Sequence, residues 1–321
     1  MKPLLRHWWP TALFFAVLLS MPLWITDGYV LQLIFRVVVF AVLGMAWNII
    51  GGYAGQLSLG HVAYFGIGAY AMTLSTERIG WNPWIGVALG AVLAALAALI
   101  IGSITFRLRG PYFALSTIAA AEIIRVLVQN QDDLTHGAVG TNAPLLFQAP
   151  NLDGKFFWGA VPLLGAVFAF STWIHNSRFG YRLRAIRENE NTAMAVGVNP
   201  AREKVLALIP SAIFTALAGS IYASYFSFVG PDTVLTLEIS VQAALIAMLG
   251  GAATVWGPIL GSIVLTLTSE IFKTYFEHTH LVVYGALLIV VVIFLPGGVV
   301  SLFMRGWRLR RETGPIGSVQ G

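Results

Sequence analysis

The feature that most constrains the fold of this chain is a succession of apolar runs of about 20 residues, the length that an α-helix needs to cross a bilayer. Charged residues make up 10% of the sequence, whereas about a quarter of a soluble domain is charged. The mean hydropathy is +0.78, and no polar block is long enough to form a separate soluble domain. We therefore predict an all-α, polytopic transmembrane helical bundle that forms one domain over residues 1–321.

The apolar runs predict about ten spans. The third is polar and rich in glycine and the eighth is short, so we expect both segments to be irregular. In an alternative arrangement, the eighth and ninth form one broken or re-entrant unit. The predicted spans are Trp9–Thr26, Tyr29–Ile50, Leu57–Ser75, Trp84–Phe106, Pro111–Gln129, Phe156–His175, Val205–Phe228, Ile239–Gly250, Val255–Phe272 and Leu281–Phe303.

The basic residues are distributed unevenly between the two sides of such a bundle. With a cytoplasmic N-terminus, fourteen lysines and arginines lie inside and three lie outside, namely Arg78, Lys155 and Lys273. Arg36 and Arg125 lie within spans, which accounts for all 19 basic residues. Because cytoplasmic loops carry an excess of Lys and Arg, we predict that both termini are cytoplasmic and that residues 130–155 form an external loop.

Residues 176–204 form a polar, basic island between two long apolar runs. Apolar residues and one glycine recur in this island at roughly helical spacing, at Leu183, Ile186, Ala193, Met194 and Gly197. Gly197 and Pro200 then supply signals that end a helix. We predict a short cytoplasmic surface helix with one side facing a partner. The alternative is a solvated loop that only fixes the topology.

Two glycine-rich segments, residues 51–72 and 250–267, begin at predicted cytoplasmic turns and lead into outward-going spans. Corresponding glycine-interrupted segments in two halves of a transporter point to its translocation pathway. Alternatively, the glycines only allow close helix packing, and the polar group around His61 is a packed, hydrogen-bonded cluster. The predicted pathway residues are Gly52, Gln56, Ser58, Gly60, His61, Gly66, Gly257 and Gly261.

Glu122 and Arg125 are ionisable residues inside a predicted span. Charges within a membrane are costly, and they are usually paired or functional. Their three-residue spacing places them on one helix face, so we predict an intramembrane ion pair. The alternative is that they relay protons in an ion-coupled transporter.

Several chemistries have no support in the sequence. It contains no cysteine and therefore no thiolate nucleophile or thiolate metal site, and the six histidines show no metal-ligand pattern. It lacks the glycine-rich P-loop and the common hydrolase motifs. The net charge of +5 follows from the membrane topology and is not a sign of nucleic-acid binding. We therefore expect no enzyme, no metal site and no cofactor in this chain.

Four stretches, taken in order, resemble one known family. They are NIIGGYAGQLSLGHVAYFGIGAYAM (48–72), RGPYFALSTIAAAEIIRVLVQN (109–130), FGYRLRAIRENENTAMAVGVNPAREKVLALIPSAIFTALAGSIYA (179–223) and GGAATVWGPILGSIVL (250–265). Together they are similar to the high-affinity branched-chain amino-acid permeases of ABC importers, and to the LivM-type branch more than to the LivH-type branch.

This resemblance implies the permease subunit of an ATP-driven importer in a bacterial inner membrane. It implies a heterodimer with a second, related permease, two cytoplasmic ATPase subunits that use ATP and Mg, and a periplasmic substrate-binding protein. The cargo would be branched-chain or other small, mostly hydrophobic amino acids. The family's coupling helix matches Arg184–Val196, and the implied coupling residues are Arg184, Ile186, Arg187, Glu188, Asn189, Ala193, Val196 and Gly197.

Other functions are compatible with the same sequence. The family includes permeases for urea, short amides and other small solutes. An ion-coupled secondary transporter is a second class, and a membrane-embedded enzyme is a third. The basic island and the missing catalytic motifs disfavour the enzyme.

Overall fold

The computed structural model describes residues 8–108, 110–147 and 152–275. This part of the chain is a helical bundle without strands, with an isolated β-bridge between Thr141 and Val229. The helices are α1 (Trp8–Trp24), α2 (Gly28–Ile50), α3 (His61–Ile79), α4 (Pro83–Thr105), α5 (Pro111–Gln129), α6 (Asp132–Thr135), α7 (Leu152–Asn176), α8 (Arg178–Glu188), α9 (Glu190–Ala195), α10 (Pro200–Phe226), α11 (Pro231–Val234), α12 (Leu237–Gly250) and α13 (Gly257–Tyr275).

Six helical segments of the described residues are long and apolar enough to cross a membrane. They are α2, α4, α5, residues 156–176 of α7, α10, and the unit formed by α11 and α12 over residues 231–250. Shorter apolar helices lie at 9–24 and 257–272. The chain is therefore a polytopic helical membrane protein. The number of ten spans stays a prediction, because the span predicted at Leu281–Phe303 and both termini lie outside the described residues.

Two of the predicted spans differ from the helices. The third was expected to begin at Leu57, but α3 begins at His61, and residues 55–60 have no regular secondary structure. In this stretch, hydrogen bonds to other elements replace helical ones. For example, the Leu59 amide donates to Thr117 Oγ1 of α5 at 3.1 Å. The predicted eighth span, Ile239–Gly250, lies within the continuous helix α12, and residues 235–236 separate α12 from the short α11 that precedes it. The third segment is thus irregular at its start, as the sequence predicts, whereas the irregularity predicted within the eighth is wrong, because residues 239–250 form uninterrupted helical turns.

Capping residues set several of the helix starts. The Asp27 carboxylate accepts the backbone N–H of Tyr29 at 2.9 Å, which satisfies one of the unpaired donors at the start of α2. At α10, Asn199 caps the Arg202 amide and Pro200 occupies the first turn, where its missing N–H is not needed. These starts follow from local sequence alone.

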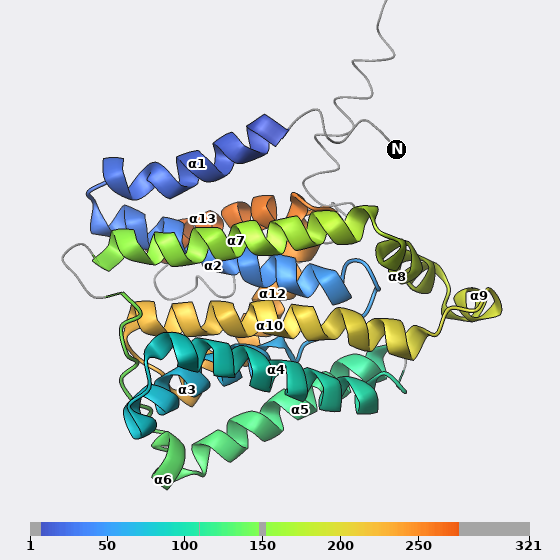
Figure 1. The fold of residues 1–321 in the computed structure, drawn as a ribbon, viewed down its shortest axis with the longest axis horizontal. Coiled ribbons are helices and arrows are strands. Elements are labelled where there is room, and N and C mark those ends of the chain that lie inside the picture. The colour runs from blue at the N-terminus through green and yellow to red at the C-terminus, as the bar shows by residue number, and fades with distance from the viewer. Residues whose placement is uncertain (1–7, 109, 148–151, 276–321) are drawn as a thin grey trace, which may run out of the picture.

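Helix α10 runs through the middle of the bundle, with α2 and α7 on one side and α3 and α4 on the other (Figure 1). Close approach to α3 depends on small residues. A Cβ added to Gly68 would collide with the Ala216 carbonyl, and one added to Gly219 would collide with the Phe65 carbonyl. Ser220 Oγ donates to the Gly68 carbonyl at 2.9 Å across the same contact. Small residues and hydroxyl bonds of this kind hold helices together in membranes.

The two ends of the bundle differ in charge. The end where α8 and α9 lie, hereafter the α8 end, is opposite the end with α6, the α6 end (Figure 1). At the α6 end lie Arg78 and the acidic pair Asp132 and Asp133. The basic residues described at the α8 end are Arg107, Arg178, Arg182, Arg184, Arg187, Arg202 and Lys204. By the positive-inside rule, the α8 end is the one expected in the cytoplasm.

Candidate functional site

The outward faces of α4 and α5 are both poorly covered, but only α5 carries charge. On α4 the large exposed side chains are apolar, as at Ile100 and Ile104, which suits contact with lipid. On α5, Leu115 and Ile123 are also exposed, yet Glu122 and Arg125 lie among them. Ionised side chains inside a membrane face protein or a watery cavity. The exposed face of α5 is therefore the candidate for a functional surface.

Glu122, Arg125 and Asp232 form an ionic cluster between α5 and α11. Arg125 Nε donates to Glu122 Oε2 at 2.9 Å, and its Nη2 donates to Oε1 at 2.5 Å, which makes the predicted ion pair bidentate. On its other side, Arg125 Nη1 lies 3.6 Å from Asp232 Oδ1. Two carboxylates share one guanidinium, so the ionic cluster has a net charge of −1 when all three groups are ionised.

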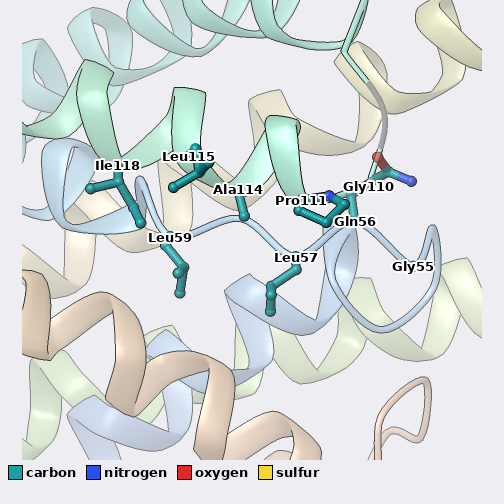
Figure 2. A pocket seen from close by; sticks show the side chains of 9 residues that line it. All are labelled: Gly55, Gln56, Leu57, Leu59, Gly110, Pro111, Ala114, Leu115 and Ile118. Atoms are coloured by element: carbon teal, nitrogen blue, oxygen red, sulfur yellow. The ribbon is translucent and has the colours of Figure 1, made fainter.

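A cavity of about 440 Å³ lies toward the α8 end of the same face (Figure 2). One wall is the stretch between α2 and α3, residues 51–60, hereafter the linker segment, and the other is the beginning of α5. Figure 2 shows mostly apolar side chains around it, with Gln56 as the one side-chain amide. The lining residues are Gly55, Gln56, Leu57, Leu59, Gly110, Pro111, Ala114, Leu115 and Ile118. Such a cavity suits an apolar group.

Ser58 and His61 do not line this cavity. His61 is 0% exposed; its Nδ1 lies 3.1 Å from Ser58 Oγ and its Nε2 lies 2.8 Å from Ser211 Oγ. Ser211 Oγ also lies 2.6 Å from the Ala46 carbonyl, to which it must donate. Ser211 then accepts from Nε2–H, and Nδ1 accepts from Ser58. This closed chain matches the packed-cluster alternative for these residues.

The glycines predicted to line a pathway lie at close packing contacts inside the protein. A Cβ on Gly60 would meet the Thr117 carbonyl at 2.8 Å, and one on Gly66 would collide with Leu235. Gly52 lies against Asn48 and the backbone of Ala253. Gly257 and Gly261 lie in the contact between α12 and α13. Of the predicted pathway residues, Gln56 is therefore the one that borders the cavity.

The predicted coupling helix Arg184–Val196 is not continuous. α8 ends at Glu188, Asn189 is extended with φ −160° and ψ 115°, and α9 begins at Glu190. The physical reason is a capping signal: the Asn189 side chain accepts the Thr192 amide at 3.0 Å, so Asn189 starts a new helix and cannot continue the old one. Gly197 ends the second helix with φ +85°.

The inner face of α8 connects the basic island to the linker segment. Leu183 and Ile186 are buried beneath α8. Arg187 Nη1 donates to the Gly52 carbonyl at 2.9 Å, and its side chain lies over Gly55, whose φ is +69°. Arg184 donates to the His175 carbonyl at 2.9 Å and thereby holds α8 to the end of α7. Movement of α8 would therefore act directly on a wall of the cavity.

Helix α9 is held from one side and open on the other. Ala193 is buried, and the buried Lys204 of α10 forms an ion pair with Glu190. Met194 and Val196 are exposed, at 43% and 75%, and Glu188 is exposed at the junction with α8. Exposed apolar side chains beside charges are typical of a surface that meets a partner protein.

Two residues of the site, Asp232 and Asn48, were not predicted from the sequence. Asp232 joins the ionic cluster from a position more than 100 residues after Arg125. Asn48 holds the two glycine-rich segments together, because its Nδ2 donates to the Thr254 carbonyl and its Oδ1 accepts the Ala253 amide, both at 2.9 Å. Leu57, in the glycine-rich segment predicted to line the pathway, is 46% exposed beside the cavity. An asparagine at an apolar helix end is a signal that could have drawn attention to Asn48.

Comparisons with known proteins agree with the sequence resemblance. A family described as "Branched-chain amino acid transport system / permease component" matches residues 29–292. The branched-chain amino acid permease protein LivM of Escherichia coli K12 is 28% identical over 291 residues, which cover 82% of this chain and 68% of the relative. LivH of Salmonella typhimurium is 24% identical over 282 residues (82% and 91%). The nucleoside ABC transporter permease NupC of Lactococcus lactis is 26% identical over 238 residues (68% and 73%).

Proposed function

The chain belongs to the branched-chain amino acid transport system permease family, and we propose that it is the LivM-type subunit of an ATP-driven importer. Its cargo is a branched-chain or another small, mostly hydrophobic amino acid. The chain works in a bacterial inner membrane with its α8 end in the cytoplasm. It binds no cofactor itself, because ATP and Mg are used by partner ATPase subunits.

The observation that carries this proposal is the contact between Arg187 and the linker segment. Arg187 lies on α8 and bonds to Gly52, while Gly55 and Gln56 of the same segment border the cavity. A protein that pushes or pulls on α8 thereby changes the shape of the cavity without touching it. An importer driven by ATP hydrolysis in a separate subunit needs a mechanical connection of this kind.

Two surfaces fit the partners of such an importer. The exposed side of α8 and α9, with Met194 and Val196, suits a cleft of a cytoplasmic ATPase subunit. The exposed face of α5 suits the second permease, since a face with Glu122 and Arg125 is costly against lipid. The cargo would pass between the two permeases along α5. A periplasmic binding protein would deliver it at the α6 end.

Co-purification and energy dependence test the proposed function. We expect this chain to purify from native membranes with two ATPase subunits and a second permease. Uptake of leucine by vesicles with the binding protein should stop when ATP is depleted and continue when an ionophore collapses the ion gradients. Uptake that follows the ion gradient and ignores ATP would instead support the ion-coupled transporter, with Glu122 and Arg125 as relay groups.

A change on the open side of α9 tests the coupling surface. Val196 is 75% exposed, so Val196→Asp leaves the fold of this chain unchanged but places a charge in the ATPase contact. We expect less ATPase subunit to co-purify and less uptake. Arg178→Gln, an exposed change at the start of α8 away from α9, is the matched control. Equal co-purification of both variants would contradict the assignment of this surface.

The cargo class needs its own measurement, because one relative is named as a nucleoside permease. Competition for uptake by leucine, alanine, urea, a short amide and a nucleoside distinguishes the candidates. We expect leucine to compete best, since the cavity is lined mostly by apolar side chains. Strong competition by a nucleoside or by urea alone would replace the amino acid as cargo and leave the importer assignment intact.

A further inference from the structure

The ionic cluster lies in the half of the bundle nearer the α6 end, because Arg125 is the fifteenth of the 19 residues of α5. Tyr70 is the tenth of the 19 residues of α3. Gly66, one turn earlier on the same face of α3, lies against Leu235, which directly follows α11. Asp232 of α11 is 76% exposed and lies beside Arg125. Sites of transporters are commonly formed by discontinuous helices such as the pair α11 and α12.

Several polar groups in and beside the ionic cluster have unused bonding capacity. Arg125 directs its Nε and Nη2 at Glu122, but its Nη1 is too far from Asp232 for a hydrogen bond, at 3.6 Å. The Tyr70 hydroxyl has no hydrogen-bond partner among the described residues, although Tyr70 is only 5% exposed. Buried hydroxyl groups usually have a partner, so this one can still bond to a polar ligand.

The apolar cavity adjoins the ionic cluster along α5. Ile118 lines the cavity, and Glu122 lies four residues further on the same face of the helix. One helical turn rises about 5.4 Å, which is close to the length of a small side chain. The Arg125 guanidinium lies against the Glu122 carboxylate, so a molecule whose charged end binds this guanidinium reaches the cavity with an apolar group of a few carbons.

We propose that the ionic cluster, Tyr70 and the cavity form one binding site for a zwitterionic amino acid with an apolar side chain. The substrate carboxylate accepts hydrogen bonds from Arg125 Nη1 and the Tyr70 hydroxyl. The ammonium group binds Asp232, and the side chain enters the cavity beside Ile118 and Leu59. This site rests on the proposed function and adds to it a place where the cargo stops within the membrane.

Protection of a single cysteine tests this site directly. The chain has no cysteine, so Val126→Cys, on the exposed face of α5 next to Arg125, is its only thiol. The complete importer without its binding protein is placed in lipid nanodiscs and treated with a water-soluble maleimide. We expect millimolar leucine to slow the labelling. Isopentylamine lacks the carboxylate, 4-methylpentanoate lacks the ammonium group and alanine lacks the long side chain, so each should protect about tenfold less well.

Variants assign the three parts of the site. In Asp232→Asn, leucine should slow the labelling no more than 4-methylpentanoate does in the parent. In Tyr70→Phe, the difference in protection between leucine and isopentylamine, which lacks the carboxylate, should become smaller. Leu59→Phe should fill part of the cavity and favour alanine over leucine. Glu238→Gln, which also removes an exposed carboxylate just after α11, is the matched control. Leucine should slow the labelling in this variant as much as in the parent.

The remaining outcomes decide against the site or against the proposed function, and they can be told apart. If leucine does not slow labelling of Val126→Cys in an importer that still takes up leucine with ATP, the site is wrong and the proposed function stands. If Val126→Cys stays unlabelled in the assembled importer with or without leucine, water does not reach this face between the two permeases and the site is wrong. If the parent importer shows no ATP-dependent uptake, the proposed function itself fails.

Discussion

The two glycine-rich segments have similar compositions, but they do different things in the structure. In residues 250–267 the glycines allow α12 and α13 to touch through their backbones: Gly250 lies against the Gly257 carbonyl, and Gly261 against the Ile246 carbonyl. In residues 51–72 the later glycines also pack tightly, but the linker segment at the start leaves one side open to the cavity.

This difference shows that glycine content alone does not mark a transport pathway. A Cβ added to Gly55 would lie nearest the Arg187 side chain, at 2.8 Å from its Cγ, whereas one added to Gly261 would collide with the backbone carbonyl of Ile246. The second segment is therefore a rigid hairpin, and the first contains a wall that a side chain from α8 holds in place. The predictions that follow test this contrast.

The largest effect is expected at Gly261. A Cβ at this position would already overlap the Ile246 carbonyl, and neither backbone can move without opening the hairpin. We expect Gly261→Leu to cost more than about 3 kcal/mol and to prevent recovery of monodisperse protein in size-exclusion chromatography. Gly165→Ala is the control, because its added Cβ would have an ordinary contact at 3.9 Å with Phe15. Normal recovery of Gly261→Leu would contradict the rigid-hairpin description.

A smaller but functionally clear effect is expected at Gly66. Its added Cβ would collide with the Leu235 side chain, which can move. Gly66→Leu should therefore fold with a stability loss of about 1–3 kcal/mol, while Leu235 and α11 shift and carry Asp232 away from Arg125. We expect uptake to stop in protein that still inserts and assembles. Gly66→Ala should retain part of the activity, and full activity of Gly66→Leu would argue against a role for α11.

The tie between the two segments is tested at Asn48. Asn48→Ala removes two hydrogen bonds at 2.9 Å and leaves the Ala253 amide and the Thr254 carbonyl without this partner. We expect a loss of about 1–3 kcal/mol, measured as a lower thermal midpoint in detergent. Asn176→Ala removes only a local bond to Thr172 at an exposed helix end and should have little effect. Equal midpoints for the two variants would show that the segments hold together without Asn48.

The smallest structural effect, with the most specific functional readout, is expected at Arg187. Arg187→Ala loses one hydrogen bond to Gly52 from an exposed side chain, so thermal stability should change little. We expect leucine uptake per ATP hydrolysed to fall by about threefold to tenfold, because α8 no longer holds the linker segment. Arg187→Lys keeps a donor and should restore part of the ratio. An unchanged ratio in Arg187→Ala would remove this contact from the coupling path.

The fold class and many helix positions could be predicted from the sequence because their signals are local. Hydropathy over about 20 residues identifies spans, and residues such as Asp27 and Asn199 mark helix starts. The three-residue spacing of Glu122 and Arg125 was enough to predict their ion pair. The capping signal of Asn189 was also local, but the helical spacing on either side of it concealed the break.

The residues of the site could not be predicted in the same way, because the site is formed by contacts between residues far apart in the sequence. His61 and Gly66 were expected in a pathway, yet packing against α10 and against Leu235 encloses them. Burial is decided by which helices lie on each side, and a glycine or histidine in sequence does not reveal its neighbours. The sequence placed Gln56 among the same predicted pathway residues. Gln56 borders the cavity and His61 and Gly66 do not, because the beginning of α5 forms the opposite wall beside Gln56.

The sequence by itself thus determined that this chain is a polytopic helical permease, and it located the basic island that contacts the linker segment. The tertiary structure alone decided which residues meet. It brought Asp232 to Arg125, Asn48 to Thr254 and Arg187 to Gly52, across 107, 206 and 135 positions. The physical reason is that helix formation depends on neighbours a few residues away, whereas the packing of preformed helices depends on the shape of whole faces.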